Sequence, residues 1–255
     1  MPQQPDSISN SASIAEDAYL AARQKPQPGG PYYLHLADVL NAITKLRPLE
    51  CRRVLDFGAG GSPYRCLFPS SEYCRADLPG DANLDYQIQS DGTTNAPEAN
   101  FDCVLSTQVL EHVARPDVYL RECFRVLRPG GTLLLSTHGF FEEHGSPRDY
   151  YRWTPDGITY IINSAGFHTQ KVYKLTSGGR AAAALLPQIL WRLADHKHPV
   201  GWVFAVANKA LYLLRGPFEK WVDRMFPEDA LVSPEKSGHV IYTGIIATAI
   251  KPELS

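Results

Sequence analysis

The sequence has few cysteines, no long apolar run and almost no net charge, and each shortage argues against a class of protein. Five cysteines among 255 residues form no CxxC pair, and their odd number is unlike a secreted disulfide scaffold. No apolar run reaches the roughly 18 residues of a spanning helix, and the amino terminus lacks the pattern of a signal peptide. A net charge of -2 argues against nucleic-acid binding. We therefore expect a cytoplasmic protein without a nucleic-acid partner.

Strand and helix patterns alternate along most of the chain. Residues 1–30 are rich in Ser, Gln, Ala and Pro and predict a flexible arm, so that one domain covers residues 31–255. An amphipathic helix is expected around residues 36–46, and further helices begin at Pro116 and Pro155. The expected strands are 51–57, 73–77, 86–89, 101–106, 132–136, 168–175 and 240–250. This alternation predicts an α/β fold, a doubly wound and mostly parallel seven-stranded sheet of Rossmann-like type.

A glycine-rich turn follows the first expected strand, in the segment Asp56-Phe57-Gly58-Ala59-Gly60. Glycines there let the backbone approach a ligand closely, although an ordinary tight turn has the same composition. Asp56 places a carboxylate beside the turn, which suits a cationic ligand and repels a pyrophosphate. Pro63 stands where the dinucleotide fingerprint requires glycine or alanine. Both features disfavour a nicotinamide or flavin dinucleotide.

With these motifs the chain resembles the class I S-adenosylmethionine (SAM) dependent methyltransferases, of the methyltransferase type 11 kind. The resemblance covers residues 50–176 and includes the segments 101–113 and 127–135. It implies that SAM is the cofactor and that the turn passes under its methionine part. The implied cofactor-binding residues are Asp56, Gly58, Ala59, Gly60, Asp77, Leu78, Asp91, Gly92, Gln108 and His112. The pattern G-x-G-x-x-P-Y over Gly58–Tyr64, together with Asp149–Thr154, is similar to methyltransferases of surface-polysaccharide or secondary-metabolite assembly.

The implied roles differ from residue to residue. Asp77, at the end of the second strand, matches the acid that accepts hydrogen bonds from the ribose hydroxyls, and Asp91-Gly92 matches the acidic position near the adenine. Gln108 follows a strand end, where ligand contacts concentrate in doubly wound sheets. His112 lies on a helix flank, where a purely structural role is the simpler interpretation.

The loop 138–153 begins at another strand end and is rich in aromatic residues, which favours an acceptor-binding lid over a solvated loop. His138 is the first candidate for a general base because histidine titrates near neutral pH, and His144 and Asp149 are its rivals. A nitrogen acceptor would need no base. His138 and His144 do not have zinc-ligand spacing, so we expect no metal.

These patterns predict a methyltransferase that acts on an oxygen or nitrogen of a small molecule or of a glycan or secondary-metabolite intermediate. A non-catalytic SAM-binding protein, a nicotinamide-dependent oxidoreductase and a methyltransferase that acts on a protein or nucleic acid are the alternatives. A helical insertion is expected at about 180–230, with apolar residues at helical spacing over 180–226. Core packing, an acceptor-site wall, a homodimer face and a peripheral membrane contact are its candidate roles; the last is suggested by tryptophans among basic residues.

Overall fold

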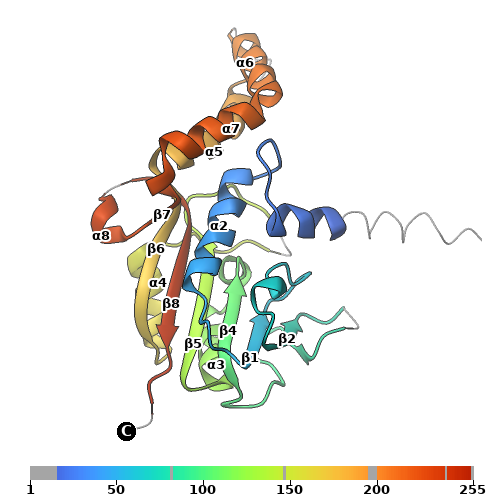
Figure 1. Ribbon diagram of the computed structural model, residues 1–255, viewed down its shortest axis with the longest axis vertical. Helices are drawn as coiled ribbons and strands as arrows, with labels where there is room; N and C mark the ends of the chain where they lie inside the picture. Colours follow the sequence, from blue (N-terminus) through green and yellow to red (C-terminus); the bar gives the residue numbers. More distant parts are fainter. Residues whose placement is uncertain (1–15, 81–82, 146–147, 195–199, 239, 254–255) are drawn as a thin grey trace, which may run out of the picture.

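The computed structural model describes residues 16–80, 83–145, 148–194, 200–238 and 240–253. Its centre is an eight-stranded sheet in the order β3-β2-β1-β4-β5-β8-β6-β7 (Figure 1). The strands are β1 (Arg53–Phe57), β2 (Glu72–Asp77), β3 (Tyr86–Gln87), β4 (Phe101–Thr107), β5 (Leu127–His138), β6 (His168–Ser177), β7 (Leu231–Val232) and β8 (Tyr242–Ile250). The predicted doubly wound α/β fold is confirmed. The eighth strand is the two-residue β7, which was not expected from the sequence.

The first five strands of this order are parallel, whereas β8 runs antiparallel to both β5 and β6. Because parallel strands end at the same edge of a sheet, β1, β2, β4 and β5 bring their carboxyl ends together. Helices α5 (Gly178–Leu193), α6 (Gly201–Leu213) and α7 (Arg215–Met225) lie beyond that edge (Figure 1). The predicted helical insertion before the last strand is confirmed, and it lies at the functional edge of the sheet.

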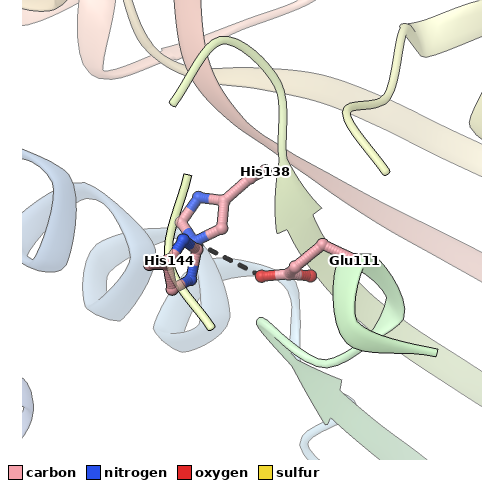
Figure 2. Close-up of side chains that lie close together, drawn as sticks. All are labelled: Glu111, His138 and His144. Carbon is pink, nitrogen blue, oxygen red and sulfur yellow. Dashed lines mark ion pairs between the residues drawn. The ribbon is translucent and has the colours of Figure 1, made fainter. Parts of the chain in front are cut away.

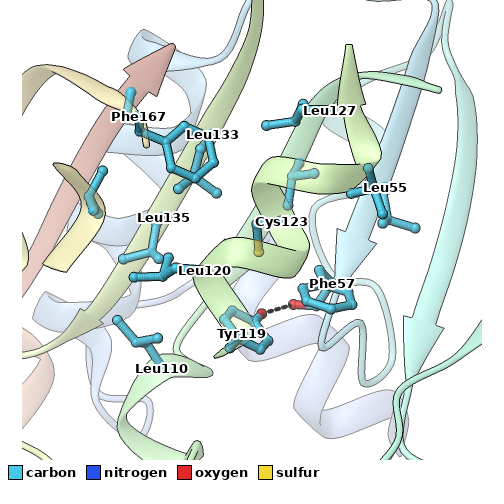
Figure 3. Packing of buried hydrophobic residues seen from close by; sticks show 14 of the residues in the cluster. Leu55, Phe57, Leu110, Tyr119, Leu120, Cys123, Leu127, Leu133, Leu135 and Phe167 are labelled. Carbon is cyan, nitrogen blue, oxygen red and sulfur yellow. Dashed lines mark hydrogen bonds between the residues drawn. The ribbon is translucent and has the colours of Figure 1, made fainter. Parts of the chain in front are cut away.

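Helices cover both faces of the sheet. On one face, α2 (Tyr33–Leu46) packs Val39, Ala42 and Ile43 against β1, β4 and β5. On the other, α3 (Pro116–Val126) and α4 (Pro155–Ser164) form the larger core with the same strands (Figure 3). The hydroxyl of Tyr119 in α3 is fully enclosed and donates to the carbonyl oxygen of Phe57 at 2.8 Å. This bond fixes α3 beneath the end of β1, just before the glycine-rich turn.

The predicted starts of α3 and α4 are confirmed, with Pro116 and Pro155 as the first helical residues. Thr154 caps α4 by accepting a hydrogen bond from the Gly157 amide through its side-chain oxygen, at 3.1 Å. Between α7 and β8 the chain adds the short helix α8 (Pro234–Ser237). Three 3-10 turns, Arg65–Leu67, Leu110–His112 and Pro227–Ala230, complete the described elements.

The amino-terminal segment differs from the expected flexible arm. Residues 16–24 form a helix, and the Tyr19 hydroxyl lies close to the glycine-rich turn, 3.4 Å from where a side chain on Gly60 would begin. Leu20 contacts Gly61 in the same way, at 3.1 Å. The apolar contact of these side chains with the turn explains why this part of the arm is ordered. The first half of the arm, residues 1–15, lies outside the described residues.

Candidate functional site

The glycine-rich turn after β1 has a backbone that only glycine adopts easily. Gly58 has φ +86°, and a Cβ there would lie 2.5 Å from Val109, so any side chain would be both strained and in collision. The amides of Gly58 and Ala59 both donate to the carbonyl oxygen of Ala76 in β2, at 2.8 and 3.1 Å. These bonds hold the turn against the end of the second strand.

Asp77 ends β2 beside this turn. Its carboxylate accepts hydrogen bonds from the Gly60 amide at 2.6 Å and from the Leu78 amide at 2.7 Å. An open cleft of about 920 Å³ lies there, lined in part by Gly60, Gly61, Ser62, Asp77 and Leu78. A half-buried carboxylate and glycine backbone at the edge of a cleft fit the sugar and the amino-acid part of a nucleoside ligand such as SAM.

The remaining predicted cofactor residues lie in other settings. Asp56 is buried and accepts a hydrogen bond from the Tyr73 hydroxyl at 2.7 Å, and burial raises its pKa to about 7. It supports the turn from beneath instead of facing the cleft. Asp91 is exposed and accepts from the amide and hydroxyl of Thr93, next to Gly92 at φ +92°. Neither Asp91 nor Gly92 is among the residues that line the cleft.

Gln108 connects this region to a second group of side chains. It directly follows β4 and has φ +55°, an uncommon backbone for a non-glycine residue. Its side-chain amide donates to Ser136 at 3.0 Å, and its side-chain oxygen lies 3.3 Å from Nε2 of His35. The left-handed backbone therefore turns Gln108 toward the end of β5 and toward α2.

His138, at the end of β5, forms the centre of this second group (Figure 2). Its Nε2 lies 3.3 Å from Oε1 of Glu111, and Oε2 of Glu111 accepts from the Thr137 hydroxyl at 2.8 Å. Both His138 and Glu111 are buried, and neither Nδ1 of His138 nor Oε1 of Glu111 has a hydrogen-bond partner among the described residues. If Nε2 carries the proton and points it at Glu111, Nδ1 is left with a free lone pair.

Burial sets the protonation of this pair. Desolvation lowers the pKa of His138 well below its usual range, and the neighbouring histidines lower it further. Desolvation also raises the pKa of Glu111 to about 7. A neutral imidazole beside an ionisable carboxyl group can accept a proton, because the carboxylate then stabilises the imidazolium.

The loop after β5 brings further rings onto His138. Phe141 stacks on the His138 ring with centroids 4.1 Å apart, and His144 meets it edge-on at 5.0 Å. His112 lies edge-on to His144 at 4.9 Å, and its Nδ1 lies 2.6 Å from the Arg148 carbonyl oxygen. His112 thus joins this loop and not the cleft beside Asp77.

The loop's own ion pair decides the role of Asp149. Its carboxylate accepts two hydrogen bonds from Arg152, both at 2.6 Å, and one from the His144 amide at 2.9 Å. The Arg152 guanidinium holds the pKa of Asp149 well below its usual range. Both carboxylate oxygens of Asp149 are engaged by Arg152 and the His144 amide, so Asp149 shapes the loop that carries His144.

Glu111, His138 and His144 also form a group that could hold a metal ion, since their ligand atoms lie within 4.8 Å of one another (Figure 2). Two imidazoles and a carboxylate are a ligand set that binds zinc and similar ions. Sequence spacing gave no sign of this group because Glu111 comes from a separate segment, and His138 and His144 are six residues apart. These three residues can therefore serve in either of two ways: His138 as a base with Glu111 as its carboxylate partner, or all three as metal ligands.

A cavity of about 270 Å³ adjoins the histidine group. His35 and Phe141, which both pack against His138, are part of its wall, as are Tyr32, Tyr33 and Leu185. Nδ1 of His35 lies 2.9 Å from the Thr243 hydroxyl, and burial lowers the pKa of His35 to about 4. Neither His35 nor Glu111 was among the site residues predicted from the sequence. A signal for His35 was present, because it interrupts the apolar face of its helix.

The chain matches a family model described as "Methyltransferase domain" over residues 55–135. It is 30% identical over 109 residues to a ubiquinone biosynthesis O-methyltransferase of Parvibaculum lavamentivorans, a match that covers 36% of this chain and 42% of that protein. The enzyme of the same name from Dinoroseobacter shibae is 27% identical over 195 residues, covering 64% of this chain and 76% of that protein. The chain thus spans less than half of the first relative's length.

Two solved structures share the fold. The [4+2]-cyclase SpnF has a TM-score of 0.55 at 19% identity, covering 97% of this chain and 96% of that chain. Phosphoethanolamine N-methyltransferase 2 of Haemonchus contortus, in complex with SAM, has a TM-score of 0.53 at 18% identity, covering 97% and 59%. At these identities the likeness concerns the fold, and the cyclase illustrates that one fold serves several reactions.

Proposed function

We propose that this chain is a class I SAM-dependent methyltransferase and that it transfers the methyl group to a hydroxyl of a small-molecule acceptor. The observation that carries the proposal is the unpartnered Nδ1 of His138, whose other ring nitrogen lies 3.3 Å from buried Glu111. Oxygen acceptors need such a proton acceptor, whereas many nitrogen acceptors do not. The names of the O-methylating relatives agree with this choice.

The residues on the cofactor side of the site hold and orient SAM. In this proposal Asp77 binds the ribose hydroxyls, and the backbone of the Gly58–Gly60 turn lies under the methionine part. SAM supplies an activated methyl group on a sulfonium centre, so the protein mainly aligns donor and acceptor. The predicted contact of Asp91-Gly92 with the adenine is not part of this proposal, because neither residue lines the cleft.

The acceptor-side residues position the hydroxyl and take its proton. In this proposal the acceptor enters the cavity bounded by Tyr32, Tyr33 and Phe141, whose aromatic lining suits an acceptor with an apolar ring. His138 lies behind Phe141, which stacks on its ring, so Phe141 moves aside to give the acceptor access to the buried Nδ1. His138 accepts the hydroxyl proton at Nδ1 as the oxygen forms its bond to the methyl carbon and the bond from that carbon to sulfur breaks. Glu111 orients the ring and stabilises the imidazolium, so it is a positioning residue. All five cysteines are unpaired, which agrees with a cytoplasmic location.

A glycan intermediate and an amine are the alternative acceptors. The test is a screen for release of S-adenosylhomocysteine with phenols, vicinal diols, sugar nucleotides and amines, followed by His138→Ala on the best acceptor. We expect turnover to fall by roughly 10²–10⁴-fold while SAM affinity stays within about twofold. His168→Ala, which alters an exposed histidine of β6, is the matched control. Full turnover by His138→Ala would remove the base from the proposal.

A further inference from the structure

Helices α5 and α6 expose an unusual amount of apolar surface. The relative exposures of Trp191, Trp202, Val206 and Tyr212 are 70%, 67%, 61% and 76%. Gly201 is the only buried residue of α6, and the helix is apolar around most of its circumference. A helix of this kind is normally covered by something, because large apolar patches are rare on the surface of soluble monomers.

The charges on this surface have one sign. The exposed basic residues of α5, α6 and α7 are Arg192, Lys209, Lys220 and Arg224. The acidic side chains of these helices, Glu219 and Asp223, are not exposed, and each is paired with an arginine. The exposed charge of the three helices is therefore entirely positive.

Two occupants could cover such a surface, and the charge pattern separates them. A symmetric contact with a second copy would bring Arg192 and Lys209 of both chains together without an acidic partner. An anionic lipid surface supplies the missing negative charge and accepts tryptophan at its interface. None of the described helices is long and apolar enough to cross a membrane. At 13 residues, α6 is about 20 Å long and can only lie in the interface.

We propose that α5 and α6 form a docking surface for an anionic lipid bilayer. The surface consists of Ile189, Trp191, Arg192, Leu193, Trp202, Val203, Val206, Lys209, Tyr212 and Leu213. Helix α6 lies on the far side of α5 and α7 from the sheet, where a flat surface can reach it (Figure 1). Tryptophan rings and basic side chains then lie at the level of the lipid headgroups.

The position of α5 gives the docking a consequence for the acceptor. Leu185, Pro187 and Gln188 of α5 line the acceptor cavity on one side, while Trp191 and Arg192 belong to the docking surface. Docking therefore brings the cavity to the membrane, and the acceptor is an amphipathic molecule held there by an apolar tail. This consequence depends on the proposed function, whereas the docking itself does not.

The test is co-sedimentation of the full chain with vesicles of phosphatidylcholine alone and of phosphatidylcholine with phosphatidylglycerol at 7:3. We expect binding to the anionic vesicles and loss of binding as salt is raised. The double variant Trp191→Ser/Trp202→Ser should lower the partition constant at least tenfold, by analogy with about 0.8 kcal/mol per buried methylene. Arg192→Gln/Lys209→Gln should lower it by about fivefold for each residue on anionic vesicles only.

The matched control is Tyr160→Ser, which removes an aromatic ring 76% exposed on α4, far from the insertion in the fold. It should bind vesicles as the wild type does. Circular dichroism and SAM affinity report whether each variant folds, and neither requires an acceptor. Failure of the wild-type protein to bind anionic vesicles would overturn the proposal. So would a dimer that Trp191→Ser/Trp202→Ser dissociates without any effect on vesicles, since the occupant is then a second copy.

Discussion

Replacing Glu111 by glutamine removes one negative charge beside the candidate base and changes little else. The amide oxygen of glutamine can still accept from Thr137, so the fold should persist. The lost charge lies 3.3 Å from His138 Nε2. At an effective dielectric constant of about 20, an imidazolium and a carboxylate at that separation attract by about 5 kcal/mol. Part of this is offset by desolvation, so we expect kcat to fall by roughly 10²–10⁴-fold.

The pH profile tests the same pair independently. Burial raises the pKa of Glu111 to about 7, and the active form is the carboxylate. The kcat/KM of the wild type should therefore rise as pH increases through about 7 and level off above it. Glu111→Gln has no group to ionise there, so this rise should disappear while SAM affinity is unchanged.

The assay is initial-rate methyl transfer between pH 5.5 and 9 on the acceptor found by the screen. Glu143→Gln, the same change at an exposed residue of the neighbouring loop, should leave both rate and profile intact. A Glu111→Gln enzyme that keeps its rate within about threefold and its rise near pH 7 would refute the assignment of the pair as a base.

Three further predictions concern stability and metal dependence. Burial raises the pKa of Asp56 to about 7, so between about pH 4 and pH 7 this carboxyl group is protonated in the folded protein and ionised in the unfolded chain. The free energy of unfolding should therefore fall by up to about 1.4 kcal/mol per pH unit over this range. Asp56→Asn should flatten that pH dependence, as measured by urea titrations. Arg180 pairs with buried Asp38 at 2.7 Å, so Arg180→Met should cost about 3–5 kcal/mol of unfolding free energy, and a loss below about 1 kcal/mol contradicts this. Dialysis against a chelator should leave methyl transfer unchanged; an enzyme that loses activity and regains it with a divalent cation uses Glu111, His138 and His144 as metal ligands instead.

Most of the fold follows from local patterns in the sequence. Pro116 and Thr154-Pro155 mark helix starts through fixed backbone geometry and capping, and the structure begins α3 and α4 there. The helix over residues 16–24 was not expected, because its order comes from tertiary contact with the glycine-rich turn. Local composition carries no information about such a contact.

The candidate site was predicted less completely than the fold. The sequence placed His138 at a strand end, and the structure agrees. It could not show that Glu111 points at His138, since these residues come from separate segments and meet only through the order of β4 and β5. The sequence also could not show that Arg152 forms an ion pair with Asp149. Because of that ion pair, Asp149 stabilises the loop and does not serve as the base. Pairings of this kind depend on side-chain direction, which spacing along the chain does not encode.

The central claim is that the cleft beside Asp77 binds SAM, and isothermal titration of the full chain with SAM, S-adenosylhomocysteine and NAD tests it most directly. We predict that SAM and S-adenosylhomocysteine bind one to one and that NAD does not bind. Asp77→Ala should weaken both by about 1.5–3 kcal/mol, or roughly 10–150-fold, because it removes charge-assisted hydrogen bonds to the ribose. Asp156→Ala, the same change at an exposed residue of α4, should bind as the wild type does. Binding of NAD in preference to SAM, or unchanged SAM affinity in a folded Asp77→Ala protein, would contradict the account.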